Sequence, residues 1–101
     1  MSKVLPPVHP GEVLREEFMG PMQISINALA RGLNVPVSRV SKIVNEERTI
    51  TPDTALRIAR FFGTSAEFWL NLQSRYDLLV AKSNEKAIQQ EVRPLVSVPA
   101  H

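Results

Sequence analysis

The residues with the most recognisable chemistry lie between positions 36 and 45. Apolar side chains recur there with a helical period, and at about 100° per residue Val40, Ile43 and Val44 fall on one side. The remaining surface is polar and cationic, and it consists of Ser38, Arg39, Ser41, Lys42 and Asn45. Arginine and lysine donate to guanine O6 and N7, asparagine pairs with adenine, and serine acts as donor or acceptor. The segment therefore carries groups that can read base edges in duplex DNA, and Val37 can contact a thymine methyl.

A reading helix needs a second helix to present it, and residues 25–33 supply one. Ser25 is a typical N-cap, and the apolar residues after it form one buried stripe of Ile26, Leu29, Ala30 and Leu33. The turn to the next helix contains Asn34, which tolerates the left-handed conformation of a tight turn. A turn this short makes the two helices cross steeply, so that the second one projects. The pair is predicted to be a helix-turn-helix whose second helix fits the major groove, about 12 Å wide.

Residues on either side of the reading helix can hold the phosphate backbone. The first turn of the 25–33 helix offers side-chain donors and free N–H groups, and the loop after residue 45 offers further donors. We expect phosphate anchoring by Ser25, Asn27, Arg48, Thr49 and Thr51.

The charge distribution separates this interpretation from a simpler one. A polar helix face is ordinary by itself, since most surface helices have a solvated side. Residues 22–63, however, carry six cations against three acids, whereas residues 64–101 are balanced and residues 1–21 are acidic. This local positive excess, the short turn and the small Ala30 at the helix crossing favour a nucleic-acid partner over a merely solvated face.

Composition argues against most enzymatic functions. The chain has 101 residues and no cysteine, which excludes disulfides, cysteine-ligated metals and thiol nucleophiles. His9 and His101 are the two histidines, and Glu16 and Glu17 are helix neighbours that do not face each other as a catalytic pair. We therefore expect no enzyme, no cofactor and no metal site. His9 is assigned to the entry of the first helix, and the aromatic residues at helical spacing are assigned to the core: Trp69, Tyr76 and the phenylalanines.

The chain is predicted to be an all-α protein with five helices. Capping residues and prolines place the helix starts near residues 10, 25, 36, 52 and 64, with Ser65 as the alternative cap for the last. Gly20-Pro21 is expected to stop the first helix. Residues 1–9 form an extended N-terminal arm, residues 10–82 the helix-turn-helix domain, and residues 83–101 a partly helical C-terminal extension. We find no run of about 20 apolar residues and no signal-peptide pattern in residues 1–10, so a cytoplasmic location is expected.

The small size of the chain favours a homodimer. A chain of this length buries only about two-thirds of its unfolded surface and often gains stability from a partner subunit. The apolar residues near the C-terminus exceed what one small core needs, and the expected dimer contact uses Leu79, Val80, Ala87 and Ile88. Such a dimer would hold two reading helices about 34 Å apart, which is one turn of DNA.

Several strings together resemble one family. They are HPGE at residues 9–12, NALA at residues 27–30, ITPDTALRIA at residues 50–59 and FGTSAEFWLNLQ at residues 62–73. In this combination the chain resembles the HigA family of antitoxins, whose helix-turn-helix domain is of the phage-repressor (Cro/CI, XRE-like) type with five helices. The resemblance implies a homodimer that binds a palindromic operator, represses its own operon and neutralises a HigB-type toxin, an RNA endonuclease acting on the ribosome. It also implies base reading by Val37, Ser38, Arg39, Ser41 and Lys42.

The sequence departs from the family after the reading helix. Family members usually have Asn-Gly-Lys-Arg there, whereas this chain has Asn45-Glu46-Glu47-Arg48. Without the glycine, Asn45 or Glu46 must supply any left-handed residue. Glu47 replaces a cation, and it is expected to weaken the attraction for phosphate unless it points away.

Two other functions are compatible with the same residues. One is a free-standing regulator of this fold without a toxin. A small basic reading frame beside the gene would argue against this function. The other is a protein-interaction module that leaves DNA untouched, which Glu46 and Glu47 support. Binding to a protein partner together with failure to bind any DNA would favour that module.

Overall fold

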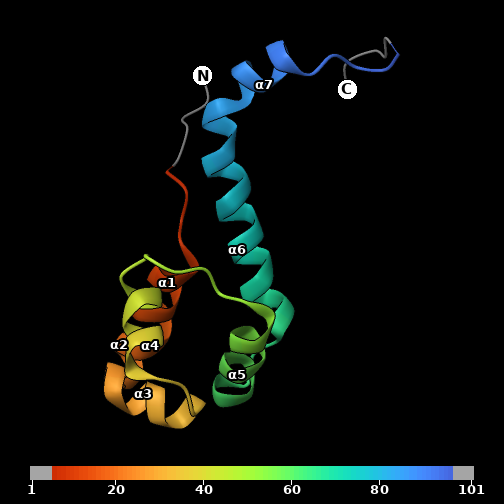
Figure 1. Ribbon diagram of the computed structural model, residues 1–101. Helices are drawn as coiled ribbons and strands as arrows, with labels where there is room; N and C mark the ends of the chain where they lie inside the picture. Colours follow the sequence, from red (N-terminus) through yellow and green to blue (C-terminus); the bar gives the residue numbers. More distant parts are fainter. Residues whose placement is uncertain (1–5, 97–101) are drawn as a thin grey trace.

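The helices occupy most of residues 6–96, the part of the chain that the computed structural model describes (Figure 1). The first helical segment is continuous and comprises α1 (Pro10–Val13), the π-helical η1 (Leu14–Met19) and α2 (Gly20–Met22). It is followed by α3 (Ile26–Leu33), α4 (Val37–Val44), α5 (Pro52–Phe62) and α6 (Ala66–Ala81). A short 3₁₀ turn, η2 (Lys82–Asn84), then leads into α7 (Glu85–Glu91). The predicted all-α, five-helix fold is confirmed.

The first helical segment extends further than the sequence analysis predicted. Gly20-Pro21 does not stop it: the backbone passes from the π-helical η1 directly into α2, and the N–H of Gly20, just before the proline, still donates to the Arg15 carbonyl in the wider π-helical register. The segment ends instead at Gln23, which adopts a left-handed conformation with φ 55°.

Hydroxyl caps start three of the later helices as the sequence predicts. The side chains of Ser25, Thr51 and Ser65 each accept a hydrogen bond from the backbone N–H three residues ahead. Between the two alternatives for α6, the structure selects Ser65, since Thr64 Oγ1 accepts instead from Trp69 Nε1 at 2.8 Å. The caps therefore fix the start of each helix within one residue.

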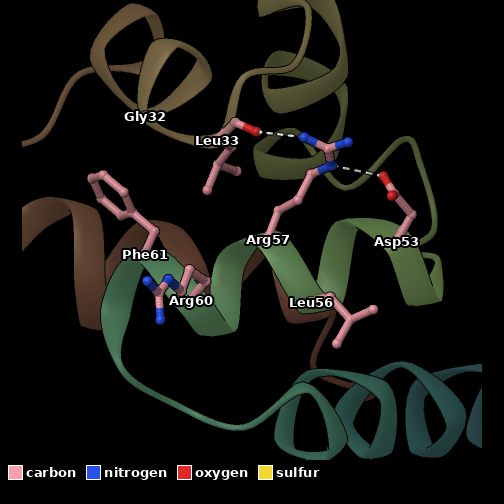
Figure 2. A pocket seen from close by; sticks show the side chains of 7 residues that line it. All are labelled: Gly32, Leu33, Asp53, Leu56, Arg57, Arg60 and Phe61. Atoms are coloured by element: carbon pink, nitrogen blue, oxygen red, sulfur yellow. Dashed lines mark hydrogen bonds and ion pairs between the residues drawn. The ribbon is translucent and has the colours of Figure 1, made fainter.

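The core lies between η1, α3, α4 and α5, and Trp69 of α6 packs against it. Trp69 is fully buried, and the tilted ring of Phe18 stands 5.1 Å from both Trp69 and Phe62. Two phenylalanines that were assigned to the core are not buried: Phe61 is 42% exposed and Phe68 is 40% exposed. The Phe61 ring lies on the backbone of α3 instead, because Gly32 has no Cβ there; an added one would come within 2.3 Å of the ring (Figure 2).

The long helix α6 extends away from the rest of the bundle and carries η2 and α7 at its far end (Figure 1). Residues 6–9 run beside it, and the His9 and Tyr76 rings meet edge to face at 4.8 Å. The rest of the predicted N-terminal arm, residues 1–5, and the end of the predicted C-terminal extension, residues 97–101, lie outside the described residues. Among the described helices, none has the length and apolar character needed to cross a membrane.

His9 caps the first helix from a buried position. Its Nδ1 accepts a hydrogen bond from the backbone N–H of Gly11 at 2.9 Å, which confirms its assignment to the helix entry. Burial lowers the pKa of His9 below its ordinary value of 6.5, while the carboxylates of Glu46 and Asp77 oppose that shift. The folded state therefore favours the neutral form of the His9 imidazole.

We predict that acidification destabilises the protein through His9. Below about pH 6.5 the unfolded chain takes up a proton that the folded chain binds less readily, so stability is full above that pH and falls below it. Melting temperatures measured between about pH 7.5 and about pH 5.5 should fall more steeply for the native chain than for His9→Asn, which keeps a capping acceptor but does not titrate there. Equal slopes for the two proteins would contradict this assignment.

Candidate nucleic-acid interface

The turn between α3 and α4 has the geometry of a helix-turn-helix. Asn34 is left-handed at φ 57°, as predicted, and its N–H donates to the Arg31 carbonyl at 3.1 Å. The N–H of Val35 donates to the Ala30 carbonyl at 3.0 Å, which closes the end of α3. Pro36 is extended and occupies the N-cap of α4, so α4 starts one residue later than its proline.

The faces of α4 are divided as its sequence pattern predicts. Val40, Ile43 and Val44 are buried in the core cluster. Their opposite side is open, and it exposes Val37, Ser38, Lys42 and Asn45, with Ser41 half-buried at one edge. Five of the six expected base-reading residues therefore share one accessible surface, which we call the α4 reading face.

Arg39 is the exception among the expected base readers. Its side chain is only 28% exposed and turns toward α5, where Nη1 lies 3.7 Å from Asp53 Oδ2. Its Nε is buried and has no hydrogen-bond partner. Arg39 therefore lies at the edge of the α4 reading face and is already paired.

The expected phosphate-anchoring residues lie at the start of α3 and in the loop before α5. Ser25 Oγ accepts from the Ala28 N–H, and Thr51 Oγ1 accepts from the Thr54 N–H; both hydroxyls thus serve as helix caps. The side chains of Asn27, Arg48 and Thr49 are exposed.

A side chain that sequence reasoning missed holds this loop in place. Ile50 is buried, and its N–H donates to Gln73 Oε1 at 2.8 Å. Gln73 Nε2 in turn donates to Asp77 Oδ1 at 3.0 Å, which orients the amide. The available signal was a glutamine on the inner stripe of α6, one turn after Trp69, where an apolar residue is the norm.

Comparison with known proteins identifies the family. The chain matches the Helix-turn-helix family over residues 14–69. It is 51% identical over 84 residues to virulence-associated protein I of Dichelobacter nodosus, covering 83% of this chain and 78% of that protein. It is 36% identical over 89 residues to antitoxin HigA-1 of Vibrio cholerae, covering 88% of this chain and 84% of that protein.

The similarity extends to solved structures. Pseudomonas aeruginosa antitoxin HigA with the higBA promoter superposes with a TM-score of 0.84 at 49% identity, covering 89% of this chain and 99% of that one. This chain belongs to the HigA family. The resemblance carried by its sequence strings is confirmed, and HigA-family proteins are DNA-binding helix-turn-helix regulators and antitoxins, not enzymes.

The departure of this HigA-family chain after α4 has a structural solution. Glu46 adopts the left-handed conformation at φ 63°, so it is the residue that replaces the usual glycine. Arg15, from η1, donates to the Val44 carbonyl and reaches Glu46 Oε2 at 3.5 Å. Hydrogen bonding to Glu16, and then to Glu46, raises the pKa of Arg15 against the effect of its partial burial. The end of α4 is thereby tied to the first helical segment, through an arginine that the sequence analysis did not identify.

The HPGE string of the HigA family also has a structural reason here. The backbone of Gly11 lies directly against α4: a Cβ on Gly11 would fall 1.8 Å from the Ile43 carbonyl oxygen. Both partners are backbone, so neither can rotate away. Gly11 thus sets the distance between the first helix and the α4 reading face.

We predict that Gly11→Ala forces α1 and α4 apart and destabilises the fold by about 3 kcal/mol, the upper part of the usual cost of overpacking. Gly20→Ala is the matched control, because Gly20 is helical and the new Cβ would lie 3.3 Å from the Arg15 carbonyl oxygen, a far less severe approach. Its effect should stay within about 1 kcal/mol. Urea denaturation followed by circular dichroism measures both, and similar midpoints would contradict the close approach.

Proposed function

We propose that this chain is a DNA-binding antitoxin that represses its own operon as a dimer on a palindromic operator. The observation that carries the proposal is the α4 reading face, which leaves donors, acceptors and a cation uncovered on the helix that follows a short turn. The Pseudomonas aeruginosa HigA relative with its promoter supports the same use of the fold.

In this proposal the centre of the α4 reading face recognises bases. Ser38, Lys42 and Asn45 are one helical turn apart in sequence and all exposed, so they can face the same stretch of major groove. Val37 and Ser41 flank them, and Arg39 acts from the edge. Phosphate anchoring falls to Ser25, Asn27, Arg48, Thr49 and Thr51, whose positions at the start of α3 and before α5 lie on either side of α4 in the chain.

The two acids after α4 are unequal in this proposal. Glu46 faces Arg15, which offsets its charge. Glu47 is exposed and has no ion pair among residues 6–96, so it weakens the attraction for nearby phosphate. Operator affinity is therefore expected to rest more on base contacts than in relatives with a cation at this position.

The proposed dimer contact lies on α6 and α7. Val80 and Ile88 are exposed, while Leu79 and Ala87 are half-buried. A groove of about 210 Å³ between the two helices joins Ile88 with Leu78, which is 58% exposed and was absent from the expected contact. A second copy of the chain would cover this apolar surface and hold two α4 helices about one DNA turn apart.

The proposed toxin partner is a HigB-type RNA endonuclease, in keeping with membership of the HigA family and similarity to antitoxin HigA-1. A small basic reading frame beside the gene would encode the first candidate. Co-purification of that product with this chain separates an antitoxin from a free-standing regulator.

We predict that Lys42→Ala weakens binding to the gene's own upstream DNA by about 1–3 kcal/mol and changes the base preference of the protein. Lys42 is exposed on the α4 reading face, so the substitution removes a contact with DNA without disturbing the fold. Fluorescence anisotropy at several salt concentrations measures the effect. Arg75→Ala, which removes an exposed cation from α6, is the control and should leave base preference unchanged. Absent or salt-independent binding by the native chain would refute the proposal.

We predict that aspartate at both Leu78 and Ile88 converts the dimer to a monomer, because two charges would then be buried in an apolar contact. Light scattering measures the mass. Leu56→Asp, at a leucine that is 63% exposed on α5, is the matched control and should remain dimeric. An unchanged dimer in the double variant would place the contact elsewhere.

A further inference from the structure

One carboxylate, that of Asp53, connects the α4 reading face to the rest of the helix-turn-helix. Its Oδ2 accepts a hydrogen bond from Arg57 Nε at 2.9 Å and lies 3.7 Å from Arg39 Nη1. Asp53 is in the first turn of α5 and Arg57 follows one turn later, whereas Arg39 comes from α4. Asp53 is thus shared by two arginines from different helices.

Arg57 fixes the position of this carboxylate relative to the turn. Its Nη1 donates to the Leu33 carbonyl at 3.0 Å and to the Asn34 carbonyl at 3.4 Å, at the end of α3 (Figure 2). The planar guanidinium therefore binds α3 through one nitrogen and Asp53 through another. Through this chain of contacts, the end of α3, the start of α5 and the edge of α4 keep one arrangement.

We infer that Asp53 is a specificity-determining positioning residue, which restrains the Arg39 guanidinium at the edge of the α4 reading face and keeps it from binding phosphates indiscriminately. This inference rests on the proposed DNA-binding function. It assigns to Asp53 a role that acts through Arg39 and needs no contact between Asp53 and DNA.

Stability alone does not account for the arrangement. Asp53 is 62% exposed at its side chain, and ion pairs this exposed contribute little to folding. The acid does suit the N-terminal end of α5, but that favourable interaction with the helix dipole needs no arginine from α4.

Arg39 is held loosely enough for the carboxylate to matter. Its pair with Asp53 is long at 3.7 Å, and its Nε makes no hydrogen bond. A guanidinium held by so long an ion pair is attracted to the nearest phosphate of any DNA sequence. The negative charge of Asp53 opposes movement of the Arg39 guanidinium toward phosphate. Arg39 then remains where the carboxylate holds it, available to a base that presents acceptors at that position.

The test is a double-mutant cycle read as a specificity ratio, which is the affinity for operator DNA divided by the affinity for a scrambled duplex. Asp53→Asn should lower this ratio roughly two- to fivefold, the size of a weak coupling between paired residues, mainly by tightening binding to the scrambled duplex. In an Arg39→Gln background, the same change should leave the ratio unaltered. Removing a charge near DNA without involving Arg39 would shift both affinities together and leave the ratio constant.

Two further variants keep the result interpretable. Asp53→Glu retains the charge and should retain most of the native ratio. Glu67→Gln removes an exposed acid from the first turn of α6, and it should leave the ratio at the native value. Circular dichroism and melting confirm that each variant is folded.

The inference is overturned if Asp53→Asn leaves the ratio unchanged, or if it lowers the ratio equally with and without Arg39. Under either result the proposed function would still stand, provided that the native chain binds its operator and that Lys42→Ala weakens this binding. If the native chain binds no operator at all, the proposed function and the inference fail together.

Discussion

The contact between the Gly11 backbone and the Ile43 carbonyl is the constraint on which the position of α4 depends. A helix of eight residues is marginal in isolation, so α4 takes its order from the elements packed against it. Its inner side buries only three apolar side chains. Backbone against backbone leaves no rotamer that could relax, and the distance between α1 and α4 is therefore set by van der Waals contact between main-chain atoms.

Side-chain hydrogen bonds also fix α4 at its C-terminal end. Arg15 holds the carbonyl at the end of α4, and Gln73 holds the loop that follows it. These two residues come from η1 and α6, so helices far apart in the sequence fix the same short segment. The polar side of α4 is thereby held in one position relative to the bundle, as the base recognition proposed for it requires.

Local signals in the sequence were sufficient for the architecture. Helix starts at Ser25, Thr51 and Ser65 follow from hydroxyl capping, and the left-handed turn at Asn34 follows from the short spacing between two amphipathic segments. Whether Asn45 or Glu46 would be left-handed could not be decided locally, because that choice depends on Arg15. Likewise, the inward turn of Arg39 depends on Asp53, which lies fourteen positions later, and helical periodicity places a side chain on a face without saying what it meets there. The stop predicted at Gly20-Pro21 was wrong, because a Gly-Pro pair signals a helix end in a regular α-helix, whereas the residues before it here are π-helical and lead directly into α2.

The left-handed Glu46 has an evolutionary consequence. A side chain in this conformation costs about 1 kcal/mol relative to glycine, and the interaction with Arg15 offsets part of that cost. The two positions are therefore epistatic: a lineage that lost the arginine would favour reversion to glycine at the helix exit, whereas one that keeps it can retain the acid. Diversification of this exit within the family should proceed by paired substitutions and not by independent drift.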